Sequence, residues 1–141
     1  MFKGRRYSFH PKRDEFGVLA DVPYLPLTLT YQNRSVEVMG VLDTGASVNV
    51  LPYNVGVQLG ASWEDQRFSV TLAGNLASAE TKGLLVLAKR GDFEPVQLAF
   101  AWTRVNNIPI LLERTNFFTE FDVCFYGSQL AFEVLPKFRA S

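Results

Sequence analysis

The sequence predicts a single all-β domain with one short C-terminal helix, and three observations lead to that prediction. Its 141 residues fit one domain, because a two-lobed enzyme usually needs roughly twice that length. Hydrophobic residues make up 48% of the chain and include twelve Phe, five Tyr and two Trp, which is enough to form a core. Short alternating apolar segments are separated by closely spaced turns, as in a β-sandwich or barrel.

The predicted strands share a period-2 pattern of apolar residues; they are 25–31, 35–42, 68–72, 83–87, 96–102, 122–125 and 130–135. Turns at Gln32–Arg34, around Gly74-Asn75 and at Arg90–Asp92 predict three hairpins between them. Pro52 to Leu59, followed by Gly60, predicts about one or two helical turns. A cap residue followed by spaced aromatic residues predicts the short helix at 115–121.

The chain divides by composition into a basic N-terminal segment, 1–21, which we expect to be loosely held, a domain at 22–136 and a tail at 137–141. Fourteen basic and fourteen acidic residues leave no net charge, which argues against a nucleic-acid partner. We find no apolar run long enough to span a membrane and no signal-like segment, so we expect no membrane partner and a cytoplasmic location.

Metal and thiol chemistry have little support in this sequence. The single cysteine, Cys124, cannot form an internal disulfide or a thiolate zinc site, and we expect it to be an inert core residue. The acidic pairs lack neighbouring histidines, because His10 is the single histidine of the chain. We therefore expect no metal and no cofactor.

The motif that carries chemistry is Asp43-Thr44-Gly45, at the end of the apolar strand that precedes it. A carboxylate at this position is partly removed from water, Gly45 lets another backbone come close, and Thr44 supplies a hydroxyl. Taken alone, Asp43 is equally typical of a turn residue whose side chain binds its own backbone.

With this motif in place, the chain resembles the retropepsin-like aspartic peptidases, the single-domain relatives of retroviral proteases that bacteria also carry. The resemblance covers residues 22 to 135 and is carried by four segments: Asp43–Ala46, Leu51-Pro52, the hairpin at Gly74, and Pro109–Leu112 leading to Asn116–Val123. It implies an acid-protease barrel that works as a two-fold homodimer. The implied activity is that of an aspartic endopeptidase acting on peptide or protein substrates.

The implied mechanism needs two carboxyls about 3 Å apart that share one proton, one acting as base on water and the other as acid. The sequence contains no second Asp-Thr/Ser-Gly. If the protein is a peptidase, the second catalytic aspartate is therefore Asp43 of another copy, with Thr44 and Gly45 completing each half of the site.

The resemblance also implies residues that contact substrate: Ala46, Ser47, Gly74, Asn75, Leu76 and Ile110. Gly74, Asn75 and Leu76 would belong to a mobile hairpin, or flap, that closes over an extended peptide. Apolar neighbours such as Val48 and Val50 predict a preference for apolar side chains around the cleaved bond. Ala46, where pepsin-like enzymes have Ser, predicts activity at mildly acidic rather than strongly acidic pH.

One residue departs from the family pattern. Bacterial relatives read Leu-Leu-Gly or Ile-Leu-Gly where this chain has Leu111-Leu112-Glu113. Glu113 either points to solvent, which we expect, or adds a carboxylate near Asp43 and impairs activity. Two alternatives therefore stay open: a catalytically impaired dimerisation or peptide-binding domain of the same fold, and a monomeric β-barrel in which Asp43 is only a turn residue.

Overall fold

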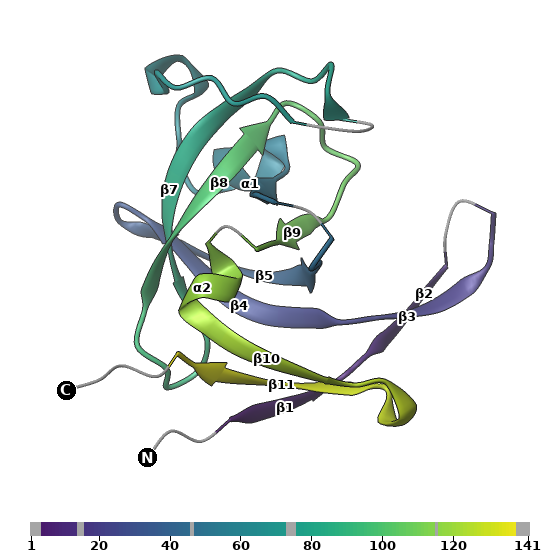
Figure 1. The fold of residues 1–141 in the computed structure, drawn as a ribbon. Helices are drawn as coiled ribbons and strands as arrows, with labels where there is room; N and C mark the ends of the chain where they lie inside the picture. Colours follow the sequence, from purple (N-terminus) through teal and green to yellow (C-terminus); the bar gives the residue numbers. More distant parts are fainter. Residues whose placement is uncertain (1–3, 14–15, 46, 73–75, 115, 138–141) are drawn as a thin grey trace.

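The fold is a closed β-barrel with a smaller sheet beside it and a β-hairpin that extends from it (Figure 1). The computed structural model describes residues 4–13, 16–45, 47–72, 76–114 and 116–137. Neighbouring barrel strands follow the order β4 (Tyr24–Tyr31), β5 (Arg34–Leu42), β9 (Ile110–Leu112), β6 (Asn49–Leu51), β8 (Val96–Thr103) and β7 (Thr81–Lys89). Pairing of β4 with β7 closes the barrel.

Two of the predicted hairpins form the walls of this barrel. Strands β4 and β5 pair antiparallel, with Tyr31 opposite Arg34, and Gln32 takes a positive φ of 53° in the tight turn. Strands β7 and β8 also pair antiparallel, and the turn between them contains Gly91 at a φ of 55°. These hairpins form because alternate residues of each strand are apolar and face the barrel interior.

The remaining predicted hairpin, whose first strand we expected at 68–72, is shorter than the sequence suggested. Residues 68–72 form no continuous strand, and their pairing with β7 is one bridge between Ser69 and Lys82. Two backbone hydrogen bonds flank that bridge, from Val70 N–H to the carbonyl of Thr81 at 2.9 Å and from Gly83 N–H to the carbonyl of Phe68 at 2.9 Å. The predicted tip at Gly74 and Asn75 lies outside the described residues.

The smaller sheet corrects our view of the N-terminal segment. Its strand order is β1 (Arg5–Ser8), β11 (Ala131–Pro136), β10 (Phe121–Tyr126), so the expected loose segment supplies a paired strand. Tyr7 stacks on the ring of Phe132 at a centroid distance of 5.3 Å, and this contact helps to hold β1 in place. The two closing strands that we predicted are β10 and β11, joined through η3 (Gly127–Gln129).

Cys124 is exposed, so the expectation of a core cysteine is wrong. Successive residues of a strand point to opposite faces, and in β10 it is the neighbouring Val123 that packs against the core.

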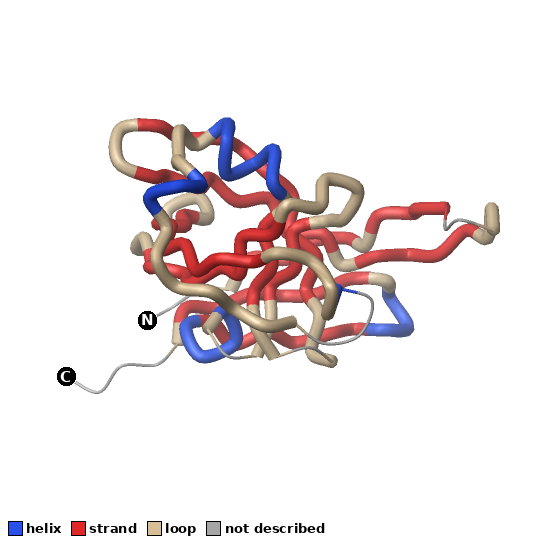
Figure 2. The backbone as a smooth tube through the Cα atoms, turned by 90° about the horizontal axis from the view of Figure 1, so that it is seen from above, coloured by secondary structure: helices blue, strands red, loops and turns tan. Residues whose placement is uncertain are grey.

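The hairpin β2 (His10–Arg13) and β3 (Leu19–Val22) extends away from the barrel in both views (Figures 1 and 2). Its strands are exposed apart from the half-buried Val22. At its base, the carbonyl of Pro23 accepts a hydrogen bond from Leu42 N–H at 3.1 Å, so the hairpin begins beside the residue that precedes Asp43.

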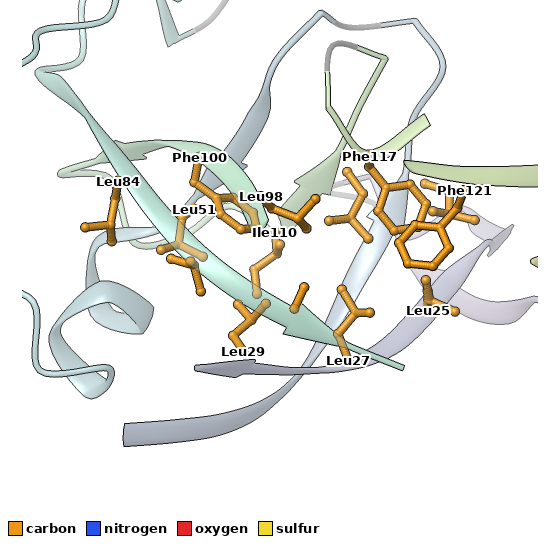
Figure 3. Close-up of a cluster of buried hydrophobic side chains, with 14 of the residues drawn as sticks. Leu25, Leu27, Leu29, Leu51, Leu84, Leu98, Phe100, Ile110, Phe117 and Phe121 are labelled. Atoms are coloured by element: carbon orange, nitrogen blue, oxygen red, sulfur yellow. The ribbon is translucent and has the colours of Figure 1, made fainter. Parts of the chain in front are cut away.

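The main core fills the barrel between β4, β6, β7, β8 and β9 and continues to α2 (Phe117–Glu120) and β10 (Figure 3). Its fully buried side chains include Leu25, Leu29, Phe100, Trp102 and Phe117. Both predicted helices are present, as α1 (Tyr53–Gln58) and α2, and Gly60 follows α1 with a φ of 82°. The short 3-10 helix η1 (Trp63–Asp65) places Trp63 edge-on to Trp102, with a centroid distance of 5.0 Å.

Gly56 is the residue through which α1 packs on the core. A Cβ at this position would lie 2.2 Å from the Trp102 ring, which is 0% exposed and cannot move aside. We expect Gly56→Ala to lower the free energy of unfolding by about 1–2 kcal/mol, because overpacking outweighs the gain in helix propensity. Urea denaturation measures this change. Gly127→Ala, where an added Cβ meets nothing within 4 Å, is the matched control and should change stability by less than about 0.5 kcal/mol.

Candidate active site

The candidate site is built where β9 runs between β5 and β6. β9 pairs in parallel with β5, from Gly40 opposite Ile110 to Leu42 opposite Leu112. It pairs antiparallel with β6 on its other side. A Cβ at position 40 would lie 2.7 Å from the Leu112 side chain, so Gly40 permits this close crossing. The loop that connects β5 to β6 therefore passes over the end of β9, and this loop begins with Asp43.

Two hydrogen bonds hold Asp43 in place. Its backbone N–H donates to the carbonyl of Leu112 at 3.0 Å, and its Oδ1 accepts the N–H of Gly45 at 2.9 Å. In the second bond the Asp43 side chain binds the backbone of its own loop. The sequence analysis kept this turn-forming role as the alternative to a catalytic role for Asp43. The turn engages one oxygen of the half-buried carboxyl and orients the other. A Cβ at position 45 would lie 3.2 Å from that Oδ1, so glycine leaves the carboxyl room.

Asn49 connects the strands beneath the loop, and the sequence analysis did not identify it. This residue is 0% exposed; its Nδ2 donates to the carbonyl of Ala99 at 3.1 Å, and its Oδ1 accepts the N–H of Glu113 at 2.7 Å. One amide thus ties β6 to β8 and to the residue after β9. The sequence contains a signal for this role, because the polar Asn49 interrupts the apolar run from Val48 to Leu51. A polar side chain buried in such a run is normally hydrogen-bonded.

Glu113 is buried, so the expectation that it points to solvent is wrong. The whole residue is 0% exposed, and within the described part of the chain neither Oε1 nor Oε2 has a hydrogen-bond partner. Its backbone is held at both ends, because its N–H binds Asn49 and its carbonyl accepts the N–H of Phe118 at 3.2 Å. The main chain therefore directs this side chain into the protein.

The surroundings of Glu113 favour its neutral form. Burial, followed by the charge of Asp43, raises the pKa of Glu113 from its ordinary value of 4.5 to about 7. The Val48 N–H and the charge of Arg114 oppose this rise, although the Val48 contact lies outside ordinary hydrogen-bond geometry. At mildly acidic pH this carboxyl is therefore protonated, and its negative charge is added only near neutrality.

A second apolar cluster lies next to the Asp43 loop. Its buried residues are Val50, Leu72 and Ala101, and the partly buried residues packed on them are Val48, Val70, Leu76, Ile108 and Leu111. The structure thus brings Val48, Val50 and Leu76, all expected to contact substrate, into one group. Ile108, which precedes β9, and Leu111 belong to this cluster as well, and the alternation of β9 places Leu111 on the face opposite Ile110.

Ile110 does not join this group, which corrects its expected role in binding substrate. Its side chain is 5% exposed and lies in the main core near Leu51, Leu98 and Phe100 (Figure 3). The period-2 alternation of β9 turns it away from Leu111. Leu111 and Ile108, and not Ile110, lie with Val48 and Val50 in the second apolar cluster.

The remaining predicted residues are placed only in part. Thr44, Gly45 and Ser47 are exposed beside Asp43. Ala46, Gly74 and Asn75 lie outside the described residues. The flap interpretation is therefore a proposal, resting on the short pairing of residues 68–70 with β7.

Other features lie away from this site. A groove of about 320 Å³ on the outer face of β4 and β5 is lined by Pro26, Leu27, Thr28, Glu37, Val38, Met39 and Arg90. It shares no residue with the Asp43 loop or the second apolar cluster, and we assign it no role. Among the described residues, no group of three or more His, Cys, Asp or Glu could hold a metal ion. No helix within those same ranges has the length and apolar character needed to span a membrane.

Comparison with known proteins identifies the fold. The sequence matches no family model and no curated protein. Among solved structures, the chain is similar to a retropepsin-like aspartic protease from Rickettsia conorii, with a TM-score of 0.61 and 12% identity over 96% of each chain. This similarity, together with the closed barrel, shows a retropepsin-like all-β fold.

Glu113 should make stability depend on pH in a defined direction. Its pKa is raised on folding, so between about pH 4.5 and 7 the folded protein binds more protons than the unfolded chain. We therefore expect stability to fall as pH rises through this window, by up to about 3 kcal/mol. Glu113→Gln removes the ionisation while keeping the shape, so the variant should lose less stability over the same range.

Urea unfolding at pH 4.5, 6 and 8 measures this difference. Glu64→Gln, at an exposed position in η1, is the matched control and should follow the wild-type curve. Parallel curves for the wild-type protein and Glu113→Gln would mean that Glu113 ionises as freely as a surface carboxyl.

Proposed function

We propose that this protein is an aspartic endopeptidase that acts as a homodimer, with Asp43 of each chain supplying one catalytic carboxyl. The observation that carries the proposal is the position of Asp43 in a retropepsin-like fold. It opens the loop above the β9 crossing, with its carboxyl oriented by the Gly45 N–H. The similar structure from Rickettsia conorii is that of a retropepsin-like aspartic protease, which supports the same activity here.

The proposed chemistry uses the proton that two adjacent carboxyls share. Like charges about 3 Å apart cannot both ionise, so one Asp43 is a carboxylate and its counterpart is a carboxylic acid. The carboxylate accepts a proton from water as that water attacks the scissile carbonyl, and the acid donates a proton to the carbonyl oxygen. The C–N bond of the resulting tetrahedral intermediate then breaks as the protonated Asp43 donates a proton to the leaving amine nitrogen and the other Asp43 accepts one from a hydroxyl of the intermediate, which restores the single shared proton. No covalent enzyme intermediate forms, so no Ser or Cys nucleophile is needed.

The burial of Glu113 favours a second copy as the source of the second carboxyl. The charge of Asp43 raises the pKa of Glu113, which makes Glu113 the candidate for a second catalytic carboxyl from the same chain among the described residues. Each of its oxygens exposes less than 1 Å² of surface, however, and neither can contact a peptide. An Asp43 pair across a two-fold axis does not meet this obstacle, because each Asp43 is only half-buried.

Substrate contacts in this proposal surround the Asp43 pair. Thr44, Gly45, Ala46 and Ser47 would line the cleft floor, and the hairpin with Gly74, Asn75 and Leu76 would close over the peptide backbone. The second apolar cluster lies beside the loop and supports a preference for apolar side chains at the cleaved bond. The domain at 22–136 and a cytoplasmic location are parts of the same proposal.

A second candidate function is a catalytically impaired dimerisation or peptide-binding domain. The observation that favours it is the buried Glu113 carboxyl, because a second carboxyl near Asp43 opposes ionisation of the Asp43 that must act as the base. Such a domain would bind an extended peptide in the same cleft without cleaving it.

Asp43→Asn tests the proposal. We expect the wild-type protein to cleave an unstructured protein such as reduced casein at mildly acidic pH, and a statine-type inhibitor to block this cleavage. The variant should lose at least about a thousandfold in kcat/KM, because the amide can be neither the base nor the shared acid. Asp65→Asn, at an exposed position in η1, is the control and should retain activity.

Mixing wild-type protein with the Asp43→Asn variant tests whether the site is shared between chains. Excess variant should draw wild-type chains into inactive heterodimers and reduce activity per wild-type chain, whereas Asp65→Asn should not. Retained cleavage in Asp43→Asn would refute the proposed peptidase. Activity that stays proportional to wild-type chain at every mixing ratio would refute the shared site. Peptide binding without cleavage would favour the second candidate.

A further inference from the structure

We propose that Glu113 is a positioning residue that extends activity toward neutral pH by helping the Asp43 pair to retain its shared proton. This inference rests on the proposed function, but it concerns a residue that the proposed mechanism does not use. The observations that carry it are the complete burial of Glu113, its unpartnered oxygens and its fixed place behind Asp43.

The backbone keeps the two residues together. Asp43 N–H binds the carbonyl of Leu112, and Glu113 follows Leu112 directly. The N–H of Glu113 binds Asn49, which is itself buried and bonded to Ala99. The loop, the strand end and the backbone of Glu113 are thus parts of one hydrogen-bonded unit, and the buried side chain of Glu113 extends from that unit.

Burial restricts what the carboxyl of Glu113 can do. Its oxygens expose less than 1 Å² each, so they reach neither bulk water nor a peptide lying over Asp43. Chemical contact with the substrate is therefore excluded, and the carboxyl acts through its charge and its proton alone. In this poorly solvated position a charge is weakly screened, so it is felt strongly by its neighbours.

The charged groups that act on Glu113 are Asp43, from the loop above it, and Arg114, next to it in the chain. Arg114 is exposed, so water screens its charge more effectively than the charge of the half-buried Asp43. The side chain that binds the Glu113 backbone, Asn49, is uncharged. Asp43 is consequently the charged group to which Glu113 couples most directly.

Coupling between these acids has a definite sign. A negative Glu113 and a fully ionised Asp43 pair repel each other, so loss of one proton makes loss of the next more difficult. At any pH, the pair is therefore protonated more often beside an ionisable Glu113 than beside a permanently neutral side chain. Because catalysis needs that shared proton, the alkaline side of the activity profile is displaced to higher pH.

The pH dependence of kcat/KM in Glu113→Gln tests this inference. With each profile scaled to its own maximum, the alkaline limb of the variant should lie about 0.5–1 pH unit below that of the wild-type protein. Near pH 7 this amounts to a relative loss of roughly three- to tenfold. Glu64→Gln is the control and should reproduce the wild-type profile. Superimposable profiles for the wild-type protein and Glu113→Gln would overturn the inference.

A second measurement does not depend on activity. Carbon-13 NMR of the labelled Glu113 carboxyl follows its titration in the wild-type protein and in Asp43→Asn. Because coupling is reciprocal, neutralising Asp43 should lower the titration midpoint of Glu113. An unchanged midpoint would overturn the inference, whether or not the protein cleaves peptides. If the midpoint moves but Asp43→Asn still cleaves, the coupling stands and the proposed catalytic role of Asp43 fails.

Discussion

The crossing of β9 between β5 and β6 is the constraint on which the candidate site depends. It brings the end of β5, the start of β6 and residue 113 into one hydrogen-bonded unit through Leu112 and the buried Asn49. A half-buried carboxyl on a free loop would turn toward water. Here the bond from Asp43 N–H to Leu112 and the bond from Gly45 N–H to Oδ1 fix its position, as catalytic preorganisation requires.

Glu113 sets the electrostatics at the end of this crossing. A glycine at position 113 would place only hydrogen atoms below Asp43, whereas Glu113 places there a buried carboxyl with no hydrogen-bond partner among the described residues. Such a group is tolerated because it takes up a proton instead of remaining charged. Its presence therefore links the stability of the domain to the uptake of that proton.

The retropepsin-like fold persists although the chain shares only 12% identity with the structure from Rickettsia conorii. Many hydrophobic side chains can fill a barrel of this kind, since core identity matters less than volume and alternation. Fold similarity therefore defines where a site can stand and leaves its chemistry to particular side chains. In this chain the proposed site assigns that chemistry to Asp43, in the loop, and gives Glu113, beneath it, a supporting role.

The sequence by itself determined the all-β class, the hairpins of β4–β5 and β7–β8 and both helices, because each of these is encoded within a few adjacent residues. It also offered Asp43 as the candidate catalytic residue. It could not determine which way Glu113, Cys124 and Ile110 point, or that β1 is paired. Those outcomes depend on contacts between distant segments, such as β5 with β9 and β1 with β11. A local pattern gives the alternation of a strand, and only its tertiary neighbours decide which of its two faces is buried.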